Sequence, residues 1–409
     1  MRRLTEQEKK QLGLLIKYYR QALYRSRSQD RREYTQKNFA KGICSQAQLS
    51  RIENGEVIRD HEIYGALLKK LNLSHERLKG RDTFLFDEFV HNLLFDLNRS
   101  DRVIDYERAY RQLEYFQGLF ADNIIYLHYT YALELVLLVL HEDYDEAGAL
   151  YDLVEGTLDI LPNPLLILTL QYLGRFHSQN KNFKKAQIHL ELALEHMLSE
   201  RVDNPSVFLD LAQNAIWLNE DRKASAYLAE AGEHFKQDPL LRALIDYYYS
   251  IIYAKAGEYD ESIGKIYMAL EHLQHYPYPV PQRKNKLIIA LVIMHLLNGD
   301  RLGARDVLIT VPKEHQTDDH HFLFAYIARD FTLFPLIQRH YNKLADFYMA
   351  KEKDRVFELD IAPRLYDYPY PLILLILKDY YWYLKARKKY KKALDLIERY
   401  RLLNIFVSS

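Results

Sequence analysis

Apolar residues recur three and four positions apart along most of this 409-residue chain, the spacing that places them on one face of an α-helix. In the first such segment, residues 5–25, they are Leu12, Leu15, Ile16, Tyr19 and Leu23. Thr5 and, three residues later, Glu8 have the spacing of a capping box, which predicts the start of this helix. Glycine (14) and proline (12) are scarce, so the pattern predicts an almost entirely helical chain.

A short pattern recurs from residue 84 onward: a turn residue, an aromatic, two polar residues and a small residue, between apolar helices. The small residues of its copies are Ala109, Ala147, Ala186, Ala224, Ser262, Ala304 and Ala393. The first six lie 38 to 42 residues apart, and the interval of 89 before the last has room for two repeats, with a weak copy near Tyr341–Leu344. A small residue allows two helices to approach closely. Each copy therefore predicts one helical hairpin, and the set predicts a stack of seven to eight.

Prolines mark positions where helices must end. They cluster at Pro162/Pro164, at Pro277/Pro279/Pro281 and at Pro369/Pro371. We interpret 276–282, which contains YPYPVP, as a hinge between two halves of the repeats. The chain is too long for one compact domain, and the pattern changes near Gly80-Arg81-Asp82. We therefore expect a head at 1–80 and a repeat domain at 84–409.

Within the head, the stretch TQKNFAKGICSQAQLSRIENG begins at Thr35 and predicts two short helices joined by a tight turn. Thr35 and Ser45 are residues that cap helix N-termini, and Gly42 permits the positive φ of a sharp turn. The second helix, Gln46 to Asn54, has Leu49 and Ile52 on its inner face. Its outer face is small and polar. Two more short helices are expected at 61–71 and 74–78.

This layout resembles the helix-turn-helix domain of the phage-repressor Cro/C1 (XRE) type. The matching residues, which span most of 10–78, are Leu12-Gly13, Ile16-Lys17, Arg20, Thr35-Gln36, Phe39-Ala40, Ile43, Ser45 and Leu49 to Gly55. The chain differs from the family by several additional residues between Arg20 and Thr35. The arginines of this insertion, Arg25, Arg27, Arg31 and Arg32, are expected to add phosphate contacts.

The resemblance implies that the second helix enters the DNA major groove. The residues it assigns to bases or phosphates are Gln36, Ser45, Gln46, Ala47, Ser50, Arg51, Asn54 and Arg59. Glutamine can bond adenine, arginine can bond guanine, and alanine can contact a thymine methyl group. Glu53 is expected to hold the turn by hydrogen bonds rather than to read bases. The alternative, a head used only for protein contacts, is disfavoured by the charge of the head.

Charge is divided unevenly along a chain that holds 56 basic and 56 acidic residues. Residues 1–80 contain 18 Lys and Arg and 9 Asp and Glu, and the remainder contains 38 and 47. A basic head on an acidic body predicts that only the head meets polyanions. A single cysteine excludes an internal disulfide framework. No apolar run is long enough to span a bilayer, so we expect a cytoplasmic protein.

Other chemistry in the sequence is sparse. Cys44 is interpreted as a filler of the turn rather than as a redox switch. His315, Asp318-Asp319 and His320-His321 are interpreted as a solvated loop and helix start, because adjacent histidines on a helix point to different faces. No phosphate-binding glycine loop or hydrolase motif is present. We therefore predict no enzyme activity, no cofactor and no metal site.

The repeats resemble tetratricopeptide repeats, with Gly257-Glu258-Tyr259 as the best match. That likeness implies an all-α fold in which a small helix-turn-helix domain precedes a right-handed superhelix, whose inner surface is lined by the first helix of each hairpin. Polar and aromatic residues there can grip an extended peptide. The candidates are Tyr131, Arg175, His177, Gln213, Asn214, Trp217, Tyr248 and His295, each with packing between helices as the competing interpretation.

A repressor-type head followed by such repeats resembles the Rgg/NprR/PlcR/PrgX group of peptide-responsive regulators. The resemblance implies a homodimeric transcription factor that binds a double-stranded DNA operator and a short imported peptide. Two alternatives remain open. In one, the repeats bind a protein partner rather than a peptide. In the other, the chain is a repeat scaffold that does not bind DNA.

Overall fold

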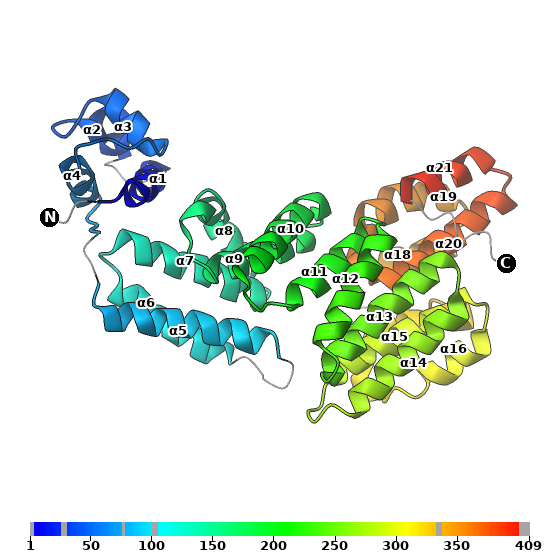
Figure 1. Ribbon diagram of the computed structural model, residues 1–409. Coiled ribbons are helices and arrows are strands. Elements are labelled where there is room, and N and C mark those ends of the chain that lie inside the picture. Colours follow the sequence, from blue (N-terminus) through cyan, green and yellow to red (C-terminus); the bar gives the residue numbers. More distant parts are fainter. Residues whose placement is uncertain (1–3, 26–30, 76–77, 100–104, 333–337, 401–409) are drawn as a thin grey trace. The chain divides into compact units, whose positions relative to one another are not determined.

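The computed structural model describes residues 4–25, 31–75, 78–99, 105–332 and 338–400 (Figure 1). The described residues form an all-α fold of helical repeats, as the sequence predicts, and contain one isolated β-bridge. The chain divides into two compact units, Met1–Val207 and Phe208–Ser409. This division falls within the repeats. It is distinct from the predicted boundary near residue 80 and from the predicted hinge at 276–282, which both stay predictions.

The head forms the start of the first unit. Its helices are α1 (Glu6–Arg25), η1 (Arg31–Tyr34), α2 (Gln36–Ala40), α3 (Gln46–Glu53) and α4 (Glu62–Lys70). The predicted capping box is present, since the Thr5 N–H donates to the Glu8 carboxylate (2.7 Å) and the Glu8 N–H donates to the Thr5 hydroxyl (3.1 Å). The turn glycine also behaves as predicted, because Gly42 has a φ of 80°.

The short helix predicted at 74–78 is wrong for Ser74, His75 and Leu78, which are not helical; residues 76 and 77 lie outside the described residues. Ser74 instead forms a parallel bridge with Asn123, in which the Ser74 N–H donates to the Asp122 carbonyl (2.6 Å) and the Ile124 N–H donates to the Ser74 carbonyl (3.0 Å). A pairing partner about 50 positions away outweighs the local helix signal. Gly80 then begins α5.

Helical hairpins complete the first unit. Their helices are α5 (Gly80–Leu97), α6 (Tyr106–Leu119), α7 (Ile124–Leu140), α8 (Tyr144–Glu155), η2 (Leu158–Ile160), α9 (Leu165–Gln179) and α10 (Phe183–Glu200). α11 (Ser206–Trp217) contains the division between the units.

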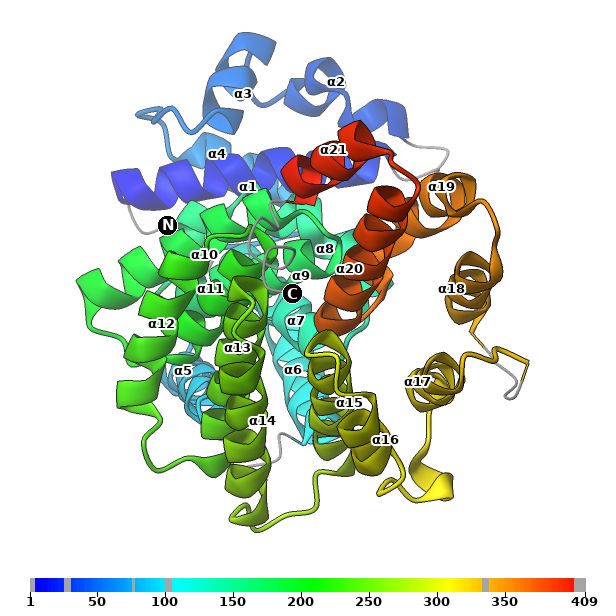
Figure 2. The same ribbon diagram turned by 90° about the vertical axis from the view of Figure 1, so that its right-hand side faces the viewer.

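The second unit continues the hairpins and ends on a less regular segment. Its helices are α12 (Asp221–His234), α13 (Pro239–Ala256), α14 (Tyr259–Gln274), α15 (Pro281–Leu297), α16 (Arg301–Leu308), η3 (Lys313–His315), α17 (Asp318–Ala328), α18 (Arg339–Met349), α19 (Lys353–Val356), η4 (Phe357–Ile361), η5 (Ala362–Asp367), α20 (Tyr370–Ala386) and α21 (Tyr390–Tyr400). Figure 2 shows α13, α14, α15 and α16 lying side by side, each packed on the next.

The repeated sequence pattern has one structural meaning in every copy that it marks. Its small residue is buried, at positions 109, 147, 186, 224, 262, 304 and 393. Five residues earlier, wherever that position is described, the backbone has a positive φ; these residues are Glu142, Lys181, Asn219, Gly257, Gly299 and Lys388. A left-handed residue turns the chain, and the small residue lets the second helix return along the first.

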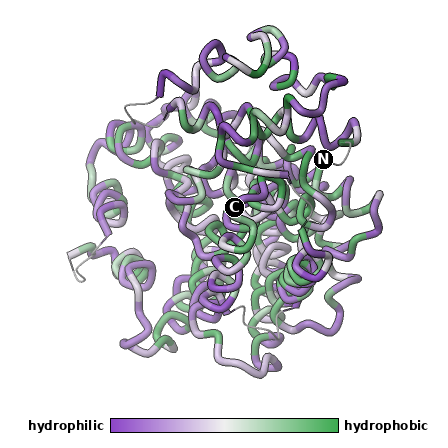
Figure 3. The backbone as a smooth tube through the Cα atoms, turned by 90° about the vertical axis from the view of Figure 1, so that its left-hand side faces the viewer, coloured by the Kyte–Doolittle hydropathy of each residue, from purple (hydrophilic) through white to green (hydrophobic). Residues whose placement is uncertain are grey.

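Each unit has its own apolar core. Figure 3 shows hydrophobic and hydrophilic residues alternating along the helices, as amphipathic hairpins require. In the first unit the buried residues of the head, such as Phe39 and Ile52, belong to one continuous core with those of α5 to α9, such as Phe86 and Leu133. The head therefore shares its interior with the first hairpins.

Candidate functional site

The N-terminal half of α3 is exposed and held at a fixed geometry. The Ser45 hydroxyl accepts from the Gln48 N–H (3.1 Å), and the Gln48 side chain accepts from the Ser45 N–H (3.0 Å), forming a second capping box. Ser45, Gln46 and Ala47 are exposed, and Ser50 is half-buried. Four of the residues predicted to contact DNA thus share one accessible helix end.

A buried ion pair holds the other end of α3. The Glu53 carboxylate accepts two hydrogen bonds from Arg20 of α1, from Nε at 2.5 Å and from Nη2 at 2.9 Å. The Gln36 side chain of α2 donates a third, at 2.7 Å. Arg20 also donates to the carbonyl of Tyr34 (2.8 Å). Glu53 therefore joins α1, α2 and α3, which confirms its predicted structural role.

Two lysines of the head act as internal clamps. The Lys9 ammonium, which is buried, donates to the carbonyls of Ile58 (2.7 Å) and Arg59 (3.0 Å). The Lys70 ammonium donates to the carbonyls of Asn38 (2.8 Å) and Phe39 (3.0 Å) at the end of α2. Lys9, Lys70 and Arg20 therefore use part of the positive charge of the head to bind its own backbone carbonyls and the Glu53 carboxylate.

Arg51 of α3 is exposed and pairs with Glu56. Its Nε lies 2.6 Å from the Glu56 carboxylate, and the two side chains are 59% and 53% exposed. An ion pair as exposed as this stabilises a protein by about 0–1 kcal/mol, so it opens readily for another acceptor. Arg51 is therefore available to a base or a phosphate at small cost.

The remaining residues predicted to bind DNA lie around this helix. Gln36 is half-buried, and its amide nitrogen is engaged by Glu53. Asn54 caps the C-terminus of α3 and is exposed, as is Arg59 in the loop that follows. Of the inserted arginines, Arg25, Arg31 and Arg32 are exposed, and Arg27 lies outside the described residues.

Cys44 precedes α3 and is half-buried. Burial and the nearby Glu53 carboxylate raise the pKa of its thiol, against a smaller opposing effect of the Leu49 backbone N–H. The thiolate is the reactive form of cysteine, so these surroundings disfavour oxidation chemistry. Its geometry fits the filler role that we expect from the sequence.

The eight residues predicted to bind a peptide all lie on the first helices of hairpins. Tyr131, Arg175 and His177 are in the first unit, and the other five are in the second. Several contact neighbours within the protein. The Arg175 guanidinium lies 4.5 Å from the centre of the Tyr172 ring, and the His295 Nδ1 lies 2.9 Å from the carboxylate of Asp300.

The candidate residues of α11 and α13 differ in their exposure and contacts. The Trp217 ring packs edge-on against Tyr370, with ring centres 4.6 Å apart. Asn214 is buried, whereas Gln213 on the same helix is exposed. Tyr248 is buried and contacts the ring of Tyr247. Packing within the protein therefore engages several of the candidate residues.

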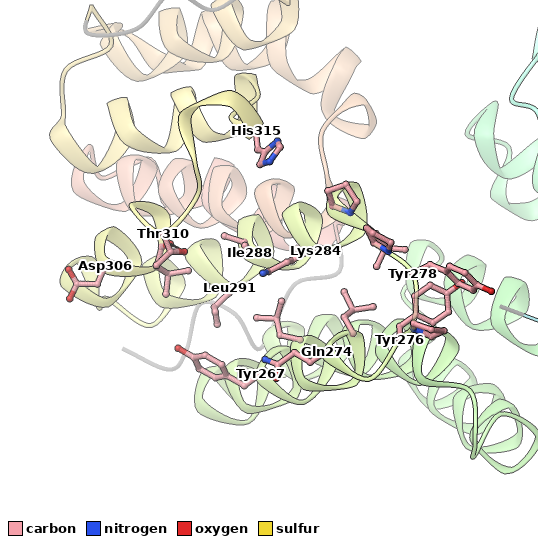
Figure 4. Close-up of a pocket in the computed structure, with 17 residues that line it drawn as sticks. Tyr267, Gln274, Tyr276, Tyr278, Lys284, Ile288, Leu291, Asp306, Thr310 and His315 are labelled. Carbon is pink, nitrogen blue, oxygen red and sulfur yellow. Dashed lines mark hydrogen bonds between the residues drawn. The ribbon is translucent and has the colours of Figure 1, made fainter. Parts of the chain in front are cut away.

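A pocket of about 960 Å³ opens in the second unit between α14, the loop that follows it, and α15 to α16 (Figure 4). In Figure 4, Tyr267 and Gln274 of α14 face Lys284, Ile288 and Leu291 of α15. The YPYPVP loop closes one end, and Asp306 and Thr310 lie near the other. The lining is mostly apolar, with a few polar groups, which is the composition of a ligand site.

None of the eight predicted peptide-binding residues lines this pocket. The signal that could have located it was the YPYPVP stretch, which we interpreted only as a hinge. Proline cannot continue a helix, so the prolines of this stretch end α14 and precede α15, and its tyrosines present apolar ring faces. Pro281 begins α15 at a position that helices favour for proline.

The histidines near α17 do not form a ligand cluster. The His320 ring accepts from the Thr317 N–H (3.0 Å) in a capping arrangement, and the Asp318 carboxylate accepts from the Gln338 N–H (2.6 Å). They serve a helix start, as the sequence predicts. The expected solvation is wrong for Asp318 and His320, which are buried, whereas His315 is exposed. A different group, Glu155, His177 and His189, is the one in the described part of the chain that places three such side chains together.

Among the described residues, no helix is long and apolar enough to cross a membrane. No protein-family model and no curated protein matches the chain. Among solved structures, the crystal structure of BtubC (BKLC) from P. vanneervenii is similar, at 19% identity and a TM-score of 0.40, over 58% of this chain and 96% of that one. A likeness this weak decides neither fold nor function.

Proposed function

We propose that this chain is a cytoplasmic, homodimeric transcriptional regulator whose head binds a double-stranded DNA operator and whose repeats bind a short signalling peptide. The observation that supports DNA binding best is that α3 is exposed at its N-terminal end and held in place at its C-terminal end. Its outward face carries the exposed Gln46 and Ala47 and the half-buried Ser50, and its other end is held through Glu53. A reading helix needs that combination, since rigid placement keeps a side chain at hydrogen-bonding distance from a base edge.

The surrounding charge supports the same proposal. Exposed arginines at 25, 31, 32, 51 and 59 occur in a head that holds 18 basic and 9 acidic residues. Such charge neutralises phosphates and makes affinity fall as salt rises. Two heads of a dimer would sit about 34 Å apart to read a two-fold operator. The acidic repeats would set that spacing.

The test is operator selection from random duplexes with the full chain, followed by binding titrations at several salt concentrations. We expect salt-sensitive, sequence-specific binding that the double variant Gln46→Ala, Arg51→Ala loses. Each base contact contributes about 1–3 kcal/mol of discrimination, so the specific component should fall by at least tenfold. A matched control is Gln112→Ala, an exposed glutamine on the repeat helix α6 and outside both candidate sites.

Absence of salt-sensitive binding by the wild-type chain would sink the proposal and favour the scaffold alternative. If the double variant bound as specifically as the wild type, another face of the head would be responsible.

The peptide component is supported by the pocket beside the YPYPVP loop. Its volume of about 960 Å³ suits several side chains of an extended ligand, and its tyrosines offer apolar faces with polar tips. Crosslinking of a peptide library to the full chain tests this. Labelling confined to α14 and α15 supports a peptide, whereas a footprint over many hairpins supports the alternative of a protein partner.

A further inference from the structure

Three helices of the first unit bring together two imidazoles and a carboxylate. Glu155 ends α8, His177 lies on α9, and His189 lies on α10. One ligand-type atom from each lies within 4.8 Å of the others. His177 and His189 are buried, and their rings stack with centres 5.1 Å apart. Two histidines and one carboxylate are a donor set for transition-metal ions.

We propose that Glu155, His177 and His189 bind one divalent transition-metal ion of the zinc class. The site comes from two adjacent hairpins, so an ion there would tie α8 to α9 and α10. Hard cations such as Mg²⁺ and Ca²⁺ prefer all-oxygen ligands and would bind poorly.

The second layer of contacts fits this assignment. The His189 Nδ1 lies 3.0 Å from the Lys185 carbonyl, which leaves its Nε2 directed to the site, 3.5 Å from the Glu155 carboxylate. Metal-binding histidines commonly use their other nitrogen in this way, because the bond fixes ring orientation and tautomer. Burial lowers the pKa of both rings, that of His177 to about 4, so both are neutral and able to ligate near pH 7.

Lys185 is the cation that now balances the carboxylate. Its ammonium lies 2.7 Å from Glu155 and also contacts the Tyr151 hydroxyl, and its side chain is 37% exposed. Burial alone would raise the pKa of Glu155, but hydrogen bonds from Lys185 and Tyr151 lower it. A metal ion would take over this role, and the flexible lysine stem would swing its ammonium into water. Lys185 therefore competes with the ion.

The test is titration of the untagged, chelator-treated full chain with Zn²⁺ by calorimetry, and with Co²⁺ by visible absorption. We expect one ion per chain. The variants His177→Gln and His189→Gln should each weaken binding by at least tenfold, the scale on which single groups around a site act. Glu155→Gln, which keeps the shape of the side chain, should do the same. Lys185→Met should tighten binding by up to about fivefold, the scale of one partly exposed ion pair, because it removes the competing charge.

The matched control is His196→Ala, which removes a histidine from the same helix outside the cluster. Zinc binding that is unchanged in both histidine variants would place the ion elsewhere and overturn the proposal. Zinc binding seen only in Lys185→Met would also overturn the proposal, since the natural chain would then not bind the ion. Helical content and thermal unfolding of each apo variant would separate loss of a ligand from loss of folding.

Discussion

Arg20 and Glu53 form a two-point ion pair in the interior of the head, with Nε 2.5 Å and Nη2 2.9 Å from the carboxylate oxygens. The two side chains are 6% and 1% exposed. Glu53 is the last residue of α3, so this pair fixes where the exposed end of the helix points. Loss of one partner leaves the other charge buried and uncompensated.

Replacing Arg20 with Met should therefore destabilise the chain by about 3–5 kcal/mol. The comparison is Arg51→Met, which breaks the exposed pair with Glu56 and should cost no more than about 1 kcal/mol. Urea unfolding followed by circular dichroism measures both. Equal losses in the two variants would mean that the buried pair does not hold the head.

Gly13→Ala should destabilise the head although alanine usually favours a helix. A Cβ at Gly13 would lie 2.1 Å from the carbonyl oxygen of Ile52, so α1 and α3 would have to separate. Forced overpacking costs about 1–3 kcal/mol, more than the 0.5–1 kcal/mol that a helix gains from the change.

The matched control is Gly118→Ala in α6, where nothing lies within 4 Å of the added carbon. It should be neutral or stabilising. Urea unfolding of both variants checks the pair, and a Gly13→Ala protein as stable as the Gly118→Ala protein would contradict the close approach of α1 to α3.

Glu142→Gly should stabilise the first unit. Glu142 has a φ of 66° at the turn of its hairpin, where the equivalent residues Gly257 and Gly299 are glycines. This conformation costs a residue with a Cβ about 1–2 kcal/mol of folding free energy, whereas glycine loses about 0.5–1 kcal/mol through its larger chain entropy in the unfolded state. We expect a net gain of up to about 1.5 kcal/mol by thermal unfolding. The reverse change, Gly257→Ala, should lower stability, and the same sign for both changes would refute the turn rule.

The stability of the first unit should depend on His128 below neutral pH. This side chain is fully buried, its Nε2 lies 2.7 Å from the Thr157 hydroxyl, and burial lowers its pKa to about 3. In the unfolded chain the pKa is about 6.5. Between these values the unfolded state binds a proton that the folded state does not. The free energy of unfolding thus falls as pH falls, by up to about 1.4 kcal/mol per pH unit.

A His128→Gln variant has no such proton to bind. Its free energy of unfolding is expected to be lower than that of the wild type at pH 7. The difference between the two free energies should become smaller as the pH is lowered to 5. Urea unfolding at three pH values in this range measures the two slopes, and parallel slopes would show that His128 does not cause the acid sensitivity.

Local chemistry made much of this fold predictable. Thr5 and Ser45 cap helices and Gly42 forms the tight turn, as predicted. Such features are predictable because a cap or a tight turn depends on residues only a few positions away. The small residue of each hairpin was equally visible, since close packing of two helices admits little else at that point.

Features built from distant residues were not predictable. Ser74 pairs with Asn123, and Glu155 lies beside His177 and His189. These contacts join residues of separate elements, so no short sequence motif predicts them. The candidate peptide groove shows the same difficulty. His295 and Trp217 have the right chemistry, but side chains on a first helix also face neighbouring helices, and these two are engaged there.

The continuous core of the first unit has a consequence for how such a chain can be rearranged. Phe39 and Ile52 of the head share one apolar interior with Phe86, and the Tyr18 hydroxyl lies where a Cβ on Gly156 would be. Separating the head from the hairpins near residue 80 would expose to water the apolar surfaces through which the two parts pack. A transplanted head would need to bring its own hairpins as far as α9, so the exchangeable part is about half of the chain rather than its first fifth.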